Sequence, residues 1–170
     1  FYRVVDQIQN RLGANAVPIQ LPIGAEDKFT GLVDLMTMKA EIYTNDLGTD
    51  IREEEIPAEL AEKAKEYRDA MVEAIASEDD ALMEKFFEDP ESITVEELRA
   101  GLRKAVCENK IVPVCCGTAF KNKGVQLLLN NVVYYMPSPV DVKAIEGELE
   151  DGTKTERHSS DDEPFSALAF

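Results

Sequence analysis

The segment IVPVCCGTAFKNKGVQ, residues 111–126, combines an apolar run, a polar loop that starts at Gly117, and the beginning of a helical pattern. This order is typical of a strand, a loop and a helix in a parallel α/β sheet, where ligands bind outside the carboxyl ends of the strands. Small residues at 117–119 let a planar ligand approach the main chain, and Lys121 and Lys123 add positive charge nearby. The segment therefore predicts a ligand-binding loop, while an ordinary strand-to-helix connection with a glycine turn has the same pattern.

The chain carries a large excess of acidic side chains. Its 170 residues include 34 acidic and 18 basic side chains, a formal net charge of −16. Residues 46–100 alone contain 19 acidic and 6 basic side chains, so most of the charge lies on one surface. Phosphate contacts need a basic face, so this composition argues against direct nucleic-acid binding. The sequence has neither an apolar run of membrane-spanning length nor a secretory leader, which favours a cytoplasmic protein with no membrane partner.

The three cysteines predict structural rather than reactive thiols. Cys107, Cys115 and Cys116 form no C-x-x-C pair, and adjacent cysteines on a strand point to opposite faces. An enzymatic interpretation would pair Cys115 or Cys116 with His158 as nucleophile and base. No orienting motif accompanies that pair, so buried thiols are the preferred interpretation.

The first half of the chain predicts a helix followed by strands. Residues 1–12 have a helical apolar period that ends near Gly13, and residues 16–23 are typical of one strand interrupted by Pro18 and Pro22. FTGLVDL (29–35) and MKAEIYT (38–44) predict two further strands, followed by a turn at residues 45–48. Because Phe1 lies inside a helical pattern, we expect a piece of a longer protein.

A long helix is predicted from Pro57 onward. Its apolar face comprises Leu60, Ala64, Tyr67, Met71, Ala74 and Ile75. The acidic stripe on the opposite face comprises Glu62, Glu66, Asp69 and Glu73. Surface helices commonly have charged outer faces, and Lys63, Lys65 and Arg68 flank the stripe for ion pairs. Like charges at this spacing oppose helix formation slightly, which favours a basic protein partner.

The second half predicts more helices and then a second domain. A helix over 79–87 has Leu82, Met83, Phe86 and Phe87 as its apolar contacts. The sequence TVEE from Thr94 is a capping box that begins the next helix. An amphipathic helix follows the loop, with the apolar residues Val125, Leu128, Leu129, Val132, Val133 and Met136. Pro-Ser-Pro at 137–139 marks a domain boundary; strands are expected at 144–149, 154–157 and from Phe165.

Four stretches in this order resemble the bacterial elongation factor G family of ribosomal translocases. They are RLGANAVPIQLPIGAED (11–27), GTAFKNKGVQ (117–126), the Pro-Ser-Pro exit, and DEPFSALAF (162–170), and the similarity extends over essentially all 170 residues. The resemblance implies an α/β (α+β) fold. Residues 1–23 and 111–137 would be the carboxyl-terminal part of a three-layer GTP-binding (G) domain, residues 24–110 an inserted G-prime subdomain, and residues 140–170 the start of the β-barrel domain II.

The same resemblance implies that Gly117, Thr118 and Ala119 form the fifth guanine-nucleotide motif, usually Gly-Ser-Ala in the family. The Ala119 N–H would donate to guanine O6, an acceptor that adenine lacks. The intact parent would hydrolyse GTP with Mg²⁺. No G-x-x-x-x-G-K-[ST], D-x-x-G or N-K-x-D motif occurs here, so we expect neither GTP hydrolysis nor a bound nucleotide for this piece alone. His158 is not equated with the family's switch histidine.

The resemblance also implies partners. The long acidic helix would contact the basic carboxyl-terminal domain of the ribosomal stalk protein. Glu73 is the best single match, with Glu62, Glu66 and Asp69 beside it on the same stripe. The parent would use GTP to move tRNA and mRNA on the ribosome. The alternative is a stand-alone acidic protein-interaction module without a nucleotide role, which would have no phosphate-binding motif upstream.

Overall fold

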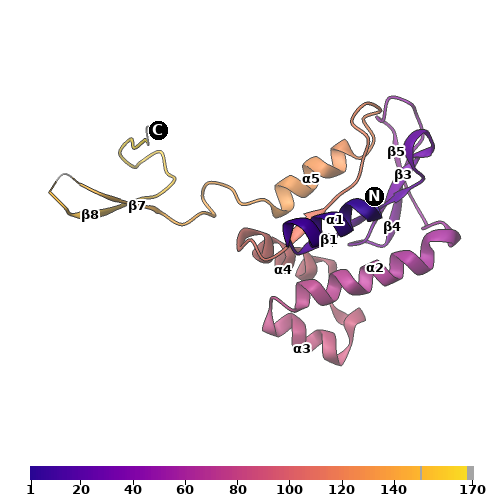
Figure 1. Ribbon diagram of the computed structural model, residues 1–170, viewed down its shortest axis with the longest axis horizontal. Helices are drawn as coiled ribbons and strands as arrows, with labels where there is room; N and C mark the ends of the chain where they lie inside the picture. The colour runs from indigo at the N-terminus through magenta and orange to yellow at the C-terminus, as the bar shows by residue number, and fades with distance from the viewer. Residues whose placement is uncertain (150, 168–170) are drawn as a thin grey trace. The chain divides into compact units, whose positions relative to one another are not determined.

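The computed structural model describes residues 1–149 and 151–167 and divides into two compact units, Phe1–Met136 and Pro137–Phe170 (Figure 1). The division lies at the first residue of the Pro-Ser-Pro sequence. The first unit contains two small sheets and five α-helices, and the described part of the second contains one two-stranded sheet. The prediction of a mixed α/β fold is confirmed at this level. Among the described strands no sheet closes into a barrel. None of the described helices combines the length and apolar composition needed to cross a membrane.

The first unit contains short strands and helices in separate runs along the chain. Its elements are α1 (Tyr2–Leu12), β1 (Ala16–Pro18), β2 (Gln20–Ile23), η1 (Glu26–Lys28), β3 (Gly31–Asp34), β4 (Lys39–Tyr43), β5 (Ile51–Glu54), α2 (Ala58–Ala76), α3 (Asp80–Glu88), η2 (Pro90–Ser92), α4 (Val95–Cys107), β6 (Val112–Val114) and α5 (Val125–Tyr135). As predicted, α1 ends at Gly13, which has the left-handed φ of 64° that favours glycine.

The single strand predicted over residues 16–23 is wrong, because the chain changes sheets at Ile19. β1 pairs in parallel with β6, whereas β2 begins the antiparallel sheet β2-β3-β4-β5. The Ile19 N–H donates to the Val114 carbonyl at 3.0 Å, and its own carbonyl accepts from the Leu35 N–H at 3.0 Å. One buried residue thus joins the two sheets.

The four-stranded sheet contains the two predicted strands β3 and β4 and one strand that was not predicted. The unpredicted strand is β5, an edge strand with the sequence IREE, and three of its four residues are exposed. An edge strand with charged residues lacks the apolar alternation that indicates a strand in sequence. The predicted border between residues 23 and 24 falls inside this sheet, between β2 and β3.

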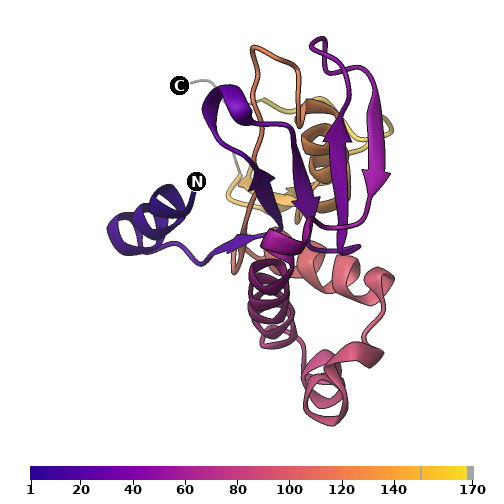
Figure 2. The ribbon, with the colours of Figure 1, turned by 90° about the vertical axis from the view of Figure 1, so that its right-hand side faces the viewer.

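The helices α2, α3 and α4 gather at one end of the four-stranded sheet (Figure 2). The core between them contains Met71 and Ile75 from α2 and Leu98 and Leu102 from α4. A Cβ atom on Gly101 would lie 2.6 Å from Leu82 Cδ1, so glycine allows α4 to approach α3 closely. Phe87 is 79% exposed, and its predicted packing is therefore wrong. The short α3 buries only Leu82.

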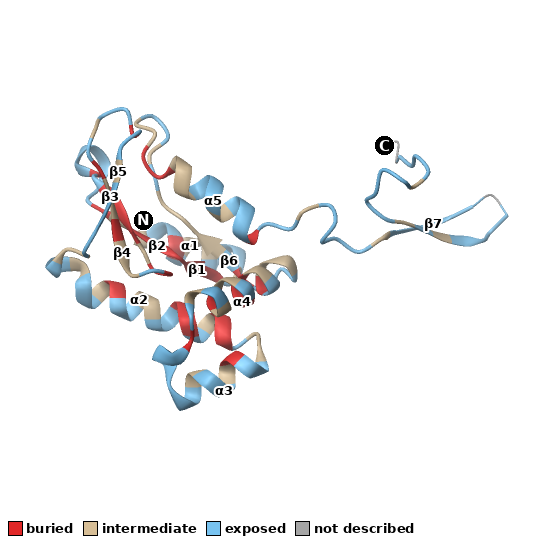
Figure 3. Ribbon diagram, turned by 180° about the vertical axis from the view of Figure 1, so that it is seen from behind, coloured by how far each residue is buried: buried red, intermediate tan, exposed pale blue. Residues whose placement is uncertain are grey.

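α5 forms as predicted, but its predicted apolar face is not buried. The side chains of Leu128, Leu129, Val132, Val133 and Met136 are between 45% and 76% exposed. Most of α5 has the exposed or intermediate colour in Figure 3. Tyr135 is instead the buried residue of the helix, at 2% exposure. Within the described unit α5 packs against α4, where the Arg103 Nη1 donates to the Tyr134 carbonyl at 2.8 Å.

The second unit contains one described hairpin. β7 (Ile145–Glu148) and β8 (Lys154–Arg157) pair antiparallel in the predicted places. Residues 165–167 are not in a strand, contrary to the prediction, and residues 168–170 of that predicted strand lie outside the described residues.

Candidate base-binding loop and acidic helix

A small cavity lies at the carboxyl end of β6, where the sequence predicted a ligand site. Its volume is about 230 Å³. It is lined by Cys115, Cys116, Gly117, Thr118, Ala119, Lys123, Gly124, Val125 and Leu128. The three residues of the proposed guanine motif therefore lie together on the wall of one cavity. The assignment of guanine to it stays a prediction.

The loop that carries these residues is a closed hairpin. The Thr118 N–H donates to the Lys123 carbonyl at 2.8 Å, and the Lys123 N–H donates back at 3.1 Å. The Asn122 N–H donates to the Ala119 carbonyl at 3.1 Å. The Ala119 N–H has no hydrogen-bond partner among residues 1–149 and 151–167. The hairpin thus uses the backbone donor of Thr118 and leaves that of Ala119 unpaired within the described residues.

Two glycines let the ends of this hairpin meet. A Cβ atom on Gly117 would lie 2.8 Å from the Lys123 carbonyl oxygen, and one on Gly124 would lie 2.7 Å from the Cys116 oxygen. Gly124 also has a φ of +89°. Backbone packing within the loop therefore requires the glycine at 117. From the sequence, we had expected a small residue there to allow the approach of a ligand.

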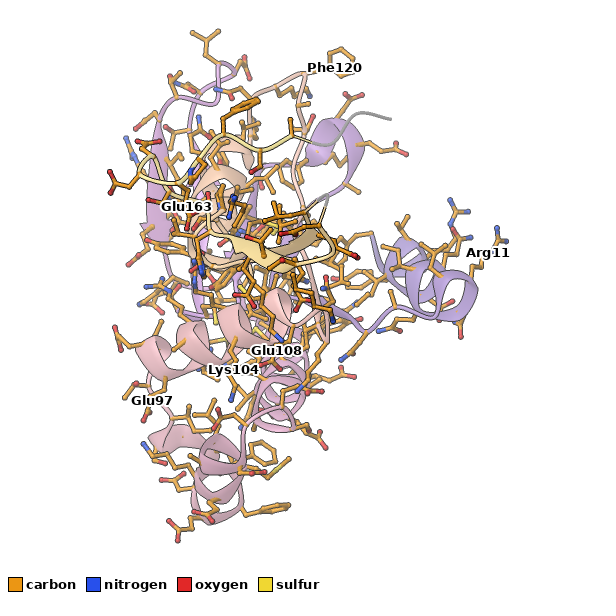
Figure 4. All side chains as sticks on the ribbon, turned by 90° about the vertical axis from the view of Figure 1, so that its left-hand side faces the viewer. Arg11, Glu97, Lys104, Glu108, Phe120 and Glu163 are labelled. Carbon is orange, nitrogen blue, oxygen red and sulfur yellow. The ribbon has the colours of Figure 1, made fainter. Side chains whose placement is uncertain are left out.

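The lysines do not both supply positive charge at the cavity. Lys123 is only 8% exposed and lies on the cavity wall. Phe120 is fully exposed at the tip of the loop (Figure 4). Its neighbour Lys121 forms an ion pair of 3.5 Å with Asp27. Of the two lysines that were expected to add positive charge, Lys123 lines the cavity and Lys121 does not. The cavity is bounded mainly by backbone and small or apolar side chains.

Both cysteines at the end of β6 are partly buried. The Cys115 Sγ accepts from the Asn131 Nδ2 at 3.4 Å. Burial raises the pKa of Cys115, and burial together with the neighbouring Cys115 raises the pKa of Cys116 to about 12. A nucleophilic thiol needs the opposite shift. These environments disfavour the enzymatic interpretation with His158.

Three residues around the loop were missed by the sequence analysis. The Cys116 N–H donates to the Gln20 Oε1 at 3.3 Å, and Gln20 is buried. The Gly124 N–H donates to the Tyr43 hydroxyl at 2.6 Å. The Gln126 Nε2 donates to the Gly48 carbonyl at 2.8 Å. These partners are 78 to 96 positions apart in the chain, and no local pattern indicates them.

The acidic stripe on α2 is exposed throughout. Glu62, Glu66, Asp69 and Glu73 all lie on the solvent side of the helix, opposite the buried Ala64 and Met71. Within the described part of the chain none of the four forms an ion pair within 4.0 Å.

The cations beside the stripe have other partners. Lys63 Nζ lies 3.5 Å from the centre of the Tyr2 ring. The Arg68 Nη1 donates to the carbonyls of Leu35 at 2.6 Å and Met36 at 2.8 Å. The expectation that these two residues neutralise the stripe through ordinary ion pairs is therefore wrong. The four carboxylates remain without a bound cation from the described chain.

Comparison with solved structures finds a protein of similar fold. A crystal structure of a protein from Thermus thermophilus matches with a TM-score of 0.71 and 31% sequence identity over 84% of this chain. The match covers 21% of the Thermus protein, so this chain spans about a fifth of that protein's length. No protein-family model matches the chain. The comparison thus shows a shared fold over most of this chain.

Proposed function

We propose that this chain belongs to a translational GTPase of the elongation factor G kind and provides its guanine-recognising loop. The observation that carries the proposal is the position of Ala119. Its backbone N–H is unpaired within the described chain, and the residue lines the cavity at the carboxyl end of β6. The G-domain and barrel assignments, with the borders at residues 23, 110 and 137, are part of the same proposal.

The chemistry of the loop fits recognition of a guanine base. An N–H donor at Ala119 matches the O6 acceptor of guanine, whereas adenine presents an amino group at that place. Two donors that face each other both stay unpaired, so the contact discriminates between the bases. Thr118 holds the neighbouring backbone through its two hydrogen bonds to Lys123. The proposal assigns only the base contact to this chain, because its sequence has no phosphate-binding P-loop.

The acidic stripe is proposed as the contact for the ribosomal stalk protein's basic carboxyl-terminal domain. The four acidic side chains are exposed, and within the described residues they have no ion pair to break before a partner binds; they are Glu62, Glu66, Asp69 and Glu73. Exposed ion pairs contribute roughly 0.2–1 kcal/mol each, so the stripe should act mainly on the association rate. In the intact protein this contact would bring the GTPase to the ribosome, where it moves tRNA and mRNA in the cytoplasm.

A substitution at Ala119 tests the base contact. In the intact protein Ala119→Ile should weaken GDP binding about tenfold or more, because a β-branched side chain crowds the cavity wall. Isothermal titration calorimetry measures the change. Phe120→Ile is the matched control, since Phe120 is fully exposed at the loop tip and does not line the cavity. An unchanged GDP affinity for Ala119→Ile would show that the loop does not touch the base.

Charge reversal tests the stalk contact. Lysine at Glu66, Asp69 and Glu73 should slow multiple-turnover GTP hydrolysis on ribosomes several-fold, because the stripe then repels a basic partner. Nucleotide affinity should not change, since these residues do not line the cavity. Initial rates at limiting factor concentration measure the effect.

The control is the same change of charge elsewhere in the unit. Lysine at Glu84, Glu88 and Glu96, three exposed residues of α3 and α4, should leave the rate close to that of the wild type. Equal slowing by the two triple variants would assign the effect to net charge and contradict the stalk contact. Loss of nucleotide binding with retained binding of a basic partner would favour the alternative of an acidic interaction module.

A further inference from the structure

The base-binding hairpin is bonded to the β4–β5 connection of the four-stranded sheet. Tyr43 is the last residue of β4, and Gly48 lies in the connection to β5. Both contact the segment 122–126, which is more than 70 positions away in the chain. The hairpin therefore has a support that is separate from the strand β6 from which it emerges.

The support is a continuous chain of hydrogen bonds. The Gly124 N–H donates to the Tyr43 hydroxyl at 2.6 Å, and this hydroxyl donates to the Gln126 Oε1 at 3.4 Å. The Gln126 Nε2 then donates to the Gly48 carbonyl at 2.8 Å. Each end of the Gln126 amide thus has a partner of the right polarity, which fixes its orientation.

Backbone contact reinforces the same junction. The Asn122 Nδ2 donates to the carbonyls of Leu47 at 3.3 Å and Gly48 at 3.4 Å. A Cβ atom on Gly48 would lie 2.3 Å from the Asn122 carbonyl oxygen, and Gly48 has a φ of +63°. Only glycine lets the connection and the hairpin come this close.

We propose that Tyr43 and Gln126 are positioning residues that set the placement of the base-binding hairpin from the β4–β5 connection. The cavity wall includes Gly124, whose N–H the Tyr43 hydroxyl holds, and Val125, which directly precedes Gln126. Neither Tyr43 nor Gln126 lines the cavity, so both act through the backbone of the hairpin. The assignment of guanine as the ligand rests on the proposed function, whereas the positioning of the loop does not.

A hydroxyl group at this place has no simple substitute. It must accept from one backbone donor and donate to one side-chain acceptor at once. Tyr43 is buried, and this burial raises the pKa of its phenol, so the hydroxyl retains the proton that it donates. Tyr43→Phe keeps the ring in the core and leaves the buried Gly124 N–H without its acceptor.

The test compares Tyr43→Phe, Gln126→Met and the double variant. In the 170-residue chain, amide hydrogen exchange at residues 118–124 should become roughly tenfold faster in Tyr43→Phe, with little change in the core of α2 and α4. In the intact protein, GDP should dissociate several-fold faster. The double variant should show less than the summed effects, because both substitutions break one chain of bonds.

Tyr67→Phe is the matched control. Tyr67 is half-buried in the same unit, and its hydroxyl forms no hydrogen bond with residues 1–149 or 151–167. It should change neither loop exchange nor GDP release. Unchanged loop exchange in Tyr43→Phe, or an increase spread evenly over the whole unit, would overturn the positioning role.

The two proposals fail in different ways. If the wild-type intact protein binds no guanine nucleotide, the proposed function is lost, and hydrogen exchange still decides whether Tyr43 positions the loop. If the wild type binds GDP and Tyr43→Phe releases it at the same rate, the positioning role for the base site is overturned while the proposed function stands.

Discussion

At the scale of single residues, burial sets the chemistry of the adjacent cysteines. Cys116 follows the end of β6 and lines the cavity, and the surrounding protein disfavours its thiolate. A thiol that keeps its proton is a small apolar group, suited to a cavity wall made of backbone and small side chains. Its contribution to the cavity is shape rather than reactivity.

The raised pKa of Cys116 predicts a loss of stability at high pH. The unfolded thiol loses its proton near its ordinary pKa of 9.0, whereas the folded thiol keeps it up to about 12. The unfolded state is therefore favoured progressively between these values, with a limiting slope of about 1.4 kcal/mol per pH unit for one group. Urea unfolding between pH 8 and pH 11 should show a shallower decline in Cys116→Ala. Parallel profiles for the two proteins would contradict the shift.

Residue types in the loop were accessible from sequence, while their partners were not. Gly117 to Ala119 was located because its pattern is local: an apolar run, a glycine and a helix in order. Tyr43 and Gln126 carry no such pattern, since their hydrogen bonds span 81 and 78 positions. The burial of Lys123 was likewise hidden, because burial depends on the folded structure and not on a local pattern.

At the scale of elements, local capping decides where α4 begins. The Glu97 N–H donates to the Thr94 Oγ1 at 3.2 Å, and the Glu97 carboxylate accepts from the Thr94 N–H at 3.0 Å. Lys85 also binds this carboxylate, and the Lys85 contact together with the Thr94 N–H lowers the pKa of Glu97 to about 2. One side chain thus fixes the helix start and links it to α3.

Removal of the cap should destabilise the first unit. Thr94→Ala loses the bond to the Glu97 N–H and should lower the free energy of unfolding by about 1 kcal/mol. Thr94→Ser keeps the hydroxyl and should remain close to the wild type. Chemical denaturation monitored by far-ultraviolet circular dichroism gives both values. Equal stability of the alanine and serine variants would show that the hydroxyl does not cap α4.

Elements with local signals were predicted well, and elements defined by tertiary contacts were not. The capping box, the glycine after α1 and the proline before α2 are local, and the helices that they delimit formed near the predicted places. The switch between sheets at Ile19 depends on Val114 and Leu35, which are far away in sequence. The predicted apolar face of α5 remained exposed because burial depends on a neighbour and not on the period alone.

At the scale of the whole molecule, the chain consists of two compact units. Among the described residues, the hydrophobic core of buried side chains lies within Phe1–Met136. The described side chains of β7 and β8 are exposed or half-buried. The first unit therefore contains the described hydrophobic core, whose burial stabilises the folded state.

A chain of residues 1–136 should unfold at nearly the same temperature as the full sequence. The reason is that the core residues are all retained. Differential scanning calorimetry measures the two midpoints. A drop of more than roughly 4–8 °C, the shift expected for 1 kcal/mol in a small domain, would show that residues 137–170 stabilise the first unit.

The parallel pair β1–β6 has a consequence for folding kinetics. It aligns Ala16 with Val112, and the intervening chain is a complete sheet with three α-helices rather than one crossover helix. In an unstructured chain, closing so long a loop is slow, because the chain loses conformational entropy before the strand pairing contributes any favourable free energy. If the intervening segment folds first, its compact structure brings β1 and β6 close together. We therefore expect refolding to proceed from the middle of this unit outward, with the strand that leads to the cavity docking last.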